Sequence, residues 1–158
     1  MCLPHYASDN LISRIVDGVD AVRHAVRDDL RQGASHTKIM GSGGVASPTD
    51  PLDKDQFSDE EMKVAVEECA RRGSYVTAHC HPAAAIRRCV TLGMRCIEHG
   101  TLIHDETAQF VAARGAYVVP TLSTCFALIE QGVQLGFPEI SLCSLKRLRI
   151  LRCLGSLR

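Results

Sequence analysis

The chain has 158 residues, with 18 basic and 18 acidic side chains and 46% hydrophobic residues. This length allows one domain, and the composition excludes disorder, a collagen-like repeat and a coiled-coil rod. The charges are unevenly placed, because residues 141–158 hold five basic residues and no acidic one. We therefore expect two unlike parts, a folded region over residues 1–140 and a basic, leucine-rich tail over residues 141–158.

The eight cysteines contain no Cys-x-x-Cys pair, which argues against a zinc ribbon and a thioredoxin-type redox site. The first residues have neither the basic nor the apolar segment of a secretory leader, and no apolar run reaches the roughly 20 residues that cross a bilayer. We expect a cytoplasmic protein with free, mostly buried thiols and no membrane partner.

An amphipathic helix is predicted from Asp17 to Gln32, because apolar residues recur there every three or four positions and Gly33 can end it. Residues 36–40 are predicted as a short strand. This strand runs directly into the glycine loop, residues 41–44, which is followed by a polar segment.

Ser58 and Glu61 have the spacing of a capping box, so a second helix is predicted to begin there and to end at Gly73. Beyond it, strands and helices alternate. The predicted strands cover residues 75–79, 95–99 and 117–121, and the predicted helices cover residues 83–92 and 106–114. Such regular alternation is typical of right-handed βα units with parallel strands, so the predicted fold class is α/β.

Lys38, His79 and His99 lie at or near the carboxyl ends of predicted strands, where α/β sheets and barrels carry their chemistry. His79 and His99 end consecutive strands, which lie about 4.8 Å apart, so both imidazoles could bind one cation. Lys38 should point to the same rim and be partly buried, which would lower its pKa. The alternatives are structural histidines and a surface lysine. Glu98 should face the opposite side of its strand, in a structural ion pair.

Several segments, in this order, resemble the metal-dependent amidohydrolase superfamily, and within it the prolidase-like (Xaa-Pro dipeptidase) and imidazolonepropionase-related branch. They are residues 37–48 (TKIMGSGGVASP), 78–79 (AH), 97–100 (IEHG) and 119–121 (VPT). The resemblance covers about residues 12 to 140. It implies a partial (β/α)8 TIM-type barrel, about strands four to seven with their helices.

The resemblance also implies chemistry. Lys38, carboxylated by carbon dioxide, would bridge two divalent metals, preferably zinc, and His79 and His99 would bind the second metal. A hydroxide held by the metals would then attack a small amide or dipeptide. His81 stands where relatives more often have tyrosine, so it is expected to contact substrate; the alternative is that it only begins the next helix beside Pro82.

The family's first-strand His-x-His pair and eighth-strand aspartate have no counterpart here, so we expect this chain to be an incomplete fragment of the barrel that holds half of the metal site. His79-Cys80-His81 remains open as an alternative for that histidine pair. A second reading is a non-catalytic, truncated barrel that folds only by association through its open sheet edges.

Other functions are disfavoured by the sequence. The segment GSGGVA, residues 41–46, satisfies a dinucleotide fingerprint, but Pro48 and Pro51 stand where its helix should continue. No P-loop motif is present. The tail has leucine at every third position, which suits neither a helix face nor a strand, and it has no aromatic residue, so we expect no nucleic-acid partner.

Overall fold

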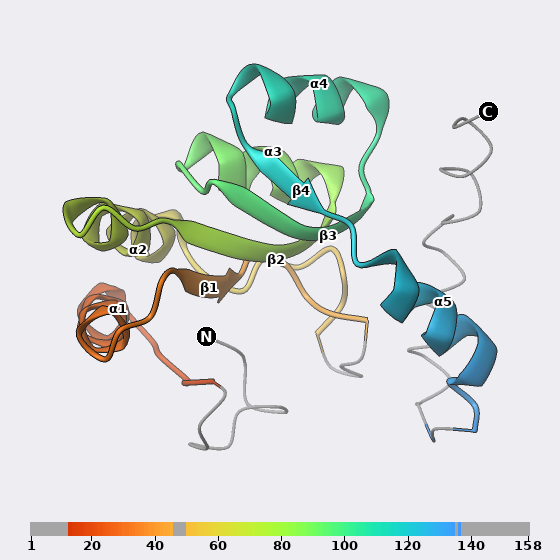
Figure 1. Cartoon of the computed structure of the whole chain (residues 1–158), viewed down its shortest axis with the longest axis horizontal. Helices are drawn as coiled ribbons and strands as arrows, with labels where there is room; N and C mark the ends of the chain where they lie inside the picture. Colours follow the sequence, from red (N-terminus) through yellow and green to blue (C-terminus); the bar gives the residue numbers. More distant parts are fainter. Residues whose placement is uncertain (1–12, 46–49, 135, 137–158) are drawn as a thin grey trace.

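The computed structural model describes residues 13–45, 50–134 and 136, and helices alternate with strands along this part of the chain (Figure 1). In chain order the elements are α1 (Val19–Arg31), β1 (Thr37–Met40), α2 (Asp59–Arg71), β2 (Val76–Pro82), α3 (Ala83–Thr91), β3 (Cys96–Leu102), α4 (Asp105–Ala113), β4 (Tyr117–Val119) and α5 (Leu122–Gln131). The predicted α/β class is confirmed, and each predicted element up to β4 is present.

The four strands form one sheet in the order β1-β2-β3-β4, and every neighbouring pair is parallel. Each pair is connected through one helix, α2, α3 or α4, as parallel neighbours require. Helices α1 to α4 lie along the same side of the sheet, whereas α5 lies apart from them (Figure 1). The sheet therefore has one face covered by helices and one face that these helices leave open.

The core lies between the sheet and the covering helices. Three fully buried residues stand at one level of neighbouring strands, namely Ile39, Ala78 and Ile97. Because side chains alternate along a strand, Lys38 and His79 face the opposite, open side. On β4 of that side, Tyr117 and Val119 are 62% and 44% exposed. Candidate chemistry thus lies on the face that the helices do not cover.

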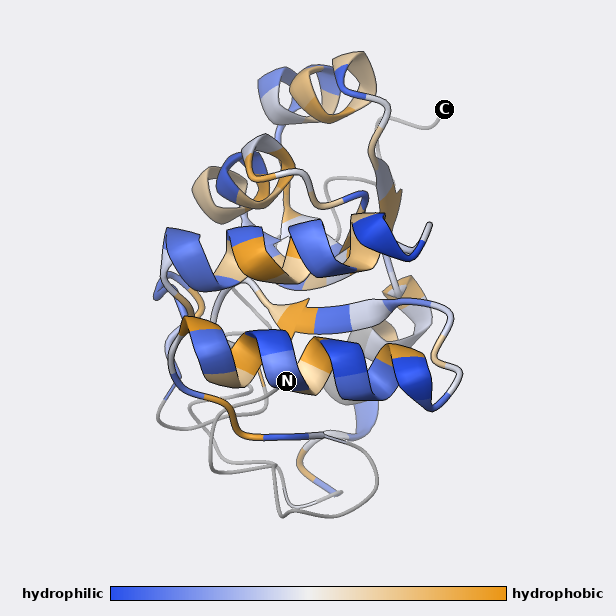
Figure 2. Ribbon diagram, turned by 90° about the vertical axis from the view of Figure 1, so that its left-hand side faces the viewer, coloured by the Kyte–Doolittle hydropathy of each residue, from blue (hydrophilic) through white to orange (hydrophobic). Residues whose placement is uncertain are grey.

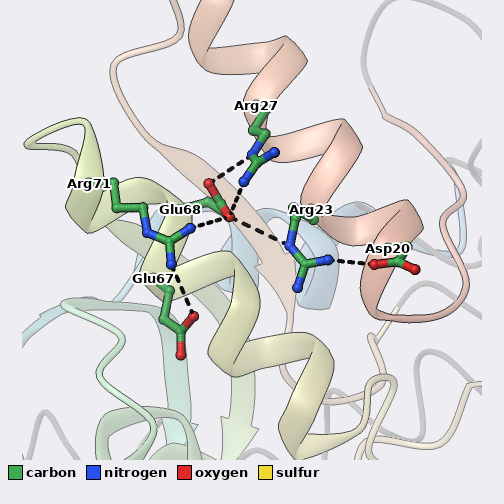
Figure 3. A network of polar contacts seen from close by, with 6 residues as sticks. All are labelled: Asp20, Arg23, Arg27, Glu67, Glu68 and Arg71. Carbon is green, nitrogen blue, oxygen red and sulfur yellow. Dashed lines mark hydrogen bonds and ion pairs between the residues drawn. The ribbon is translucent and has the colours of Figure 1, made fainter.

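Helices α1 and α2 pack against each other, as their amphipathic patterns predict, and Figure 2 shows their apolar residues as orange bands between hydrophilic ones. Glu68 of α2, with a side chain only 5% exposed, accepts hydrogen bonds from Arg27 of α1 at 2.8 and 2.9 Å. Arg71 adds a contact at 2.8 Å and Arg23 one at 3.6 Å (Figure 3). A buried carboxylate with three arginines therefore joins the two helices.

The predicted capping box is present at the start of α2. Ser58 Oγ accepts from the Glu61 amide at 3.3 Å, and the Ser58 amide donates to Glu61 Oε2 at 2.7 Å. The other Glu61 carboxylate oxygen accepts from the Gly18 amide at 2.8 Å. One side chain thus caps α2 and also anchors the segment that begins α1.

Helix α5 was not predicted from the sequence, because its first turn has no acidic residue and its last turn no basic one. The tail, residues 141–158, and the boundary at residue 140 lie outside the described residues. No helix in the described ranges is both long enough and apolar enough to cross a membrane. Among the residues whose side chains the structure describes, Cys69, Cys80 and Cys89 are buried free thiols and Cys96 is a half-buried one.

Candidate metal centre

Three imidazoles gather on β2 and β3. The strands continue past the predicted ends to Pro82 and Leu102, so His79 and His99 stand at mid-strand and His81 near the end of β2. The ring centroid of His79 lies 4.5 Å from that of His99 and 4.8 Å from that of His81, and the His81 and His99 rings stack at 5.1 Å. The structure therefore brings together the two histidines that the sequence singled out. It also adds His81, which is 3% exposed and shares a strand face with His79 two residues earlier.

His99 reaches this cluster through an unusual backbone conformation. Its register partner is Cys80 and not His79, so regular alternation would send the imidazole to the helix-covered face. However, His99 has a φ of 74° and Gly100 a φ of 57°, in the left-handed region that side-chain-bearing residues seldom adopt. The expectation that His79 and His99 occupy equivalent register positions on their strands was wrong by one residue. The left-handed conformation of His99 nevertheless brings its ring next to that of His79.

Each imidazole is held through one of its two nitrogens. His79 Nε2 lies 3.2 Å from the Gly43 carbonyl oxygen, His81 Nδ1 lies 2.7 Å from Thr101 Oγ1, and His99 Nδ1 lies 2.7 Å from Thr121 Oγ1. Since a carbonyl only accepts, Nε2 of His79 carries the proton and Nδ1 keeps its lone pair. One ring nitrogen fixed by a neighbour is the arrangement that metal-binding histidines usually have.

The glycine loop after β1 fits closely around His79. The amide of Gly41 donates to the His79 carbonyl oxygen at 2.8 Å. A Cβ on Gly43 would clash with the carbonyl oxygens of Asp50 and Pro51, whereas one on Gly44 would meet only the His79 ring, at 3.5 Å. Residues 41–45 and 50–58 contain no helix, so the glycine segment opens no dinucleotide-binding helix.

Burial keeps the imidazoles neutral at pH 7. It is the main reason why the pKa of His79 falls to about 4 and that of His81 to about 3, and the neighbouring His99 adds to both shifts. Burial also lowers the pKa of His99, followed by the charge of Lys38, while Glu98 opposes the shift. Neutral imidazoles present the lone pairs that a metal ion needs.

Lys38 lies on the same sheet face as His79, because its register partner on β2 is Thr77, two residues before His79. The lysine charge lowers the pKa of both His79 and His99, which shows that it acts on this cluster. The prediction that Lys38 is partly buried was wrong, since the residue is exposed on the open face. An ammonium group has no lone pair for a cation, so Lys38 could serve as a ligand only after a chemical change.

Glu98 is the second correction. It was expected to face away from the histidines, but its register partner on β2 is His79, and parallel partners point to the same side. Its carboxylate raises the pKa of His99. The sequence pattern missed this because the left-handed residue follows Glu98, so two consecutive side chains of β3 point to one face.

The donor set of this cluster matches part of a metal site. Within residues 13–45, 50–134 and 136, no group of three or more His, Cys, Asp or Glu side chains could hold a metal ion. The described residues therefore offer two well-oriented imidazoles, His79 and His99, with Lys38 beside them. This set fits an ion only if Lys38 or residues outside these ranges supply further ligands.

Comparisons with known proteins identify relatives of this chain. The model of the amidohydrolase family matches residues 1–150. Ochratoxinase from Aspergillus niger is 42% identical over 109 residues, which is 69% of this chain and 23% of that protein. The crystal structure of an amidohydrolase has 51% identity and a TM-score of 0.83, over 87% of this chain and 33% of that chain. A prolidase complexed with N-methylphosphonate-L-proline has 44% identity and a TM-score of 0.83, over 87% and 34%.

The chain thus spans well under half the length of each of these relatives. Its four parallel strands, with helices along one side, form part of the TIM-type barrel that the relatives share, which confirms the predicted partial (β/α)8 fold. The family match over residues 1–150 and the shared fold over 87% of the chain lead to one conclusion: the chain belongs to the amidohydrolase family.

Proposed function

We propose that this chain forms part of a metal-dependent hydrolase that cleaves carbon–nitrogen bonds in small amide or dipeptide-like substrates. The observation that carries the proposal is the pair of neutral imidazoles, His79 and His99, with ring centroids 4.5 Å apart on adjacent parallel strands. Lys38 stands on the same face and acts on both rings. The names of the relatives, an amidohydrolase, a prolidase and an ochratoxinase, support a hydrolase.

The metal-binding residues of the proposal are Lys38, His79 and His99. The exposed Lys38 amine would react with carbon dioxide, forming a nitrogen–carbon bond and releasing one proton, to give a carbamate with two oxygen donors. Nitrogen and oxygen donors suit zinc, and the same set accepts manganese, cobalt or iron. In the complete site, Lys38 as its carbamate, His79 and His99 would hold two divalent ions, whose chemistry would be to lower the pKa of water and to polarise the amide carbonyl.

In this scheme, other residues of the chain orient the metal-binding imidazoles and contact the substrate. Gly43 fixes the proton of His79 on Nε2, which directs the Nδ1 lone pair toward the site. His81 is neutral, buried and held by Thr101 through Nδ1, so its Nε2 would form one hydrogen bond with substrate. A relative that binds N-methylphosphonate-L-proline favours a substrate with an acylated amino acid nitrogen. A tetrahedral phosphonate there has the shape of an amide under attack.

The test is a comparison of Lys38→Ala with Lys63→Ala, a control that removes another exposed lysine from α2. Each chain is assayed for bound metal by elemental analysis, with and without bicarbonate, and for hydrolysis of an Xaa-Pro dipeptide. We expect bicarbonate-dependent metal binding in the wild type and in Lys63→Ala and its loss in Lys38→Ala, and we expect turnover, where it is measured, to depend on Lys38 in the same way. Unchanged metal content and turnover in Lys38→Ala would contradict the proposal.

A second candidate is a non-catalytic barrel fragment that associates with another copy. Among the described strands, β1 and β4 each pair on one side only, and Tyr117 and Val119 are exposed on the open face. Parallel sheets are normally covered on both faces, and open edges pair with other chains. Light scattering that shows a dimer, together with no metal and no turnover in the wild type, would favour this candidate. A monomer would count against it.

A further inference from the structure

We propose that Thr121 is a positioning residue for His99. The hydroxyl of Thr121 holds the His99 imidazole so that its Nε2 is directed toward His79 and Lys38. The proposal deepens the proposed function and rests on it, since orientation of His99 matters most if His99 binds a metal. Thr121 Oγ1 lies 2.7 Å from His99 Nδ1, a short hydrogen bond between the segment after β4 and the middle of β3.

The backbone on both sides of this bond is strained. In the described ranges, two residues other than glycine have a positive φ, and they are the two bonded partners: His99 at 74° and Thr121 at 44°. A left-handed conformation is rare for any such residue and rarer still for a β-branched one such as threonine. Strained residues of this kind persist where the surrounding structure fixes them, and they cluster at functional sites.

The same arrangement occurs a second time in this cluster. His81 of β2 is bonded through Nδ1 to Thr101 of β3, also at 2.7 Å. In both cases a histidine is held by a threonine from the next strand along the sheet or from the segment just after that strand. In both cases Nδ1 is occupied and Nε2 is left for a ligand. Because the same histidine–threonine hydrogen bond forms twice in this cluster, we infer that its role is to orient the imidazole ring.

The physical role follows from how imidazoles bind metals. An imidazole whose Nδ1 proton is donated to a hydroxyl keeps its lone pair on Nε2 and cannot rotate without losing that bond. Removal of such a partner typically costs about 10- to 100-fold in metal affinity. Thr121 would therefore raise the affinity of the site for metal without contacting the metal.

The experiment uses three variants of the full chain. Thr121→Val removes the hydroxyl but stays β-branched, so the backbone strain is unchanged, and Thr121→Ser keeps the hydroxyl. Thr107→Val is the matched control, because Thr107 Oγ1 contacts His104 Nδ1 at 3.4 Å, away from the cluster. Long-range ¹H–¹⁵N NMR of the metal-free chains reports the tautomer of each histidine, and a competition titration with a chelator gives zinc affinity.

We expect His99 as a single Nδ1–H tautomer in the wild type and in Thr121→Ser, and as a tautomer mixture in Thr121→Val. Zinc affinity should fall about 10- to 100-fold in Thr121→Val and should recover in Thr121→Ser, with Thr107→Val unchanged. An Nε2–H tautomer of His99 in the wild type would overturn the proposal even if Thr121→Val fails to fold. Equal losses in Thr121→Val and Thr121→Ser would overturn it as well.

The two proposals fail in different ways. A wild-type chain that binds no zinc contradicts the proposed function, and the tautomer comparison in the metal-free chains then decides the role of Thr121. A wild-type chain that binds zinc, with the His99 tautomer and the affinity both unchanged in Thr121→Val, contradicts the positioning role and leaves the proposed function standing.

Discussion

Replacement of Gly43 by alanine should disturb the candidate metal centre through the backbone. An added Cβ would lie 2.7 Å from the carbonyl carbon of Pro51 and closer still to the carbonyl oxygens of Asp50 and Pro51. These are backbone atoms, which cannot rotate away. Since non-bonded atoms prefer a separation of about 3.5 Å or more, the loop must shift by about 1 Å. Gly43 offers the carbonyl that holds His79, so the shift reaches the site.

The size of the effect follows from two terms. Forcing an extra carbon into a filled space costs about 1–3 kcal/mol of unfolding free energy. The bond from His79 Nε2 to the Gly43 carbonyl is 3.2 Å long, so a shift of about 1 Å would break it, at a further cost of about 1 kcal/mol. With its ring no longer held, His79 should bind zinc about 10- to 100-fold more weakly.

Gly44→Ala is the matched control, one residue further along the same loop. Its Cβ would meet only the His79 ring, at ordinary contact distances of 3.5 and 3.7 Å. We expect a change in unfolding free energy within about 0.5 kcal/mol and wild-type zinc affinity. Urea denaturation and chelator competition measure both quantities. Equal behaviour of Gly43→Ala and Gly44→Ala would refute the reasoning that backbone contact, and not loss of glycine itself, disturbs the site.

Two further predictions concern the helix pair and the third histidine. The Arg27 hydrogen bonds, and then the charges of Arg27, Arg71 and Arg23, hold the pKa of Glu68 below its ordinary value of 4.5 although burial opposes them. This stabilisation is present above pH 4.5 and is lost as the pH falls through the lower folded-state pKa. The urea midpoints of Glu68→Gln and wild type should therefore differ at pH 7 and converge in acid. A difference between the two midpoints that stays constant with pH would contradict this prediction. His81→Asn should keep wild-type zinc affinity. It should raise the KM for a dipeptide about fivefold, because it removes one hydrogen bond of about 1 kcal/mol. Weaker zinc binding in this variant would instead identify His81 as a metal ligand, paired with His79.

Local signals in the sequence were sufficient for most of the fold. The capping box at Ser58 and Glu61 is formed as predicted, because its partners lie three residues apart and depend on no distant contact. The order of strands and helices followed from periodicity and from glycines at the helix ends. Helix α5 was missed because its first turn has no acidic residue and its last turn has no basic one.

The candidate site was predictable in part. Periodicity predicted Lys38, His79 and His99 at or near strand ends, and the family resemblance suggested a metal. The residues lie on the predicted strands, but β2 and β3 continue three residues beyond His79 and His99. The burial of Lys38 was misjudged because the open face of the sheet depends on which elements cover it, which no local pattern records. Glu98 was misjudged because one left-handed residue, His99, breaks the strict alternation on which the prediction relied.

The sequence by itself determined the parallel α/β architecture, the helix boundaries near their caps and the residue types able to bind a metal, since these depend on neighbours within a few positions. Tertiary structure alone decided that Thr101 and Thr121 hold two of the rings and that Gly43 holds the third. These contacts join residues 20 or more positions apart. Their formation depends on strand register and on single backbone dihedrals, which change the direction of a side chain without changing the pattern of residues.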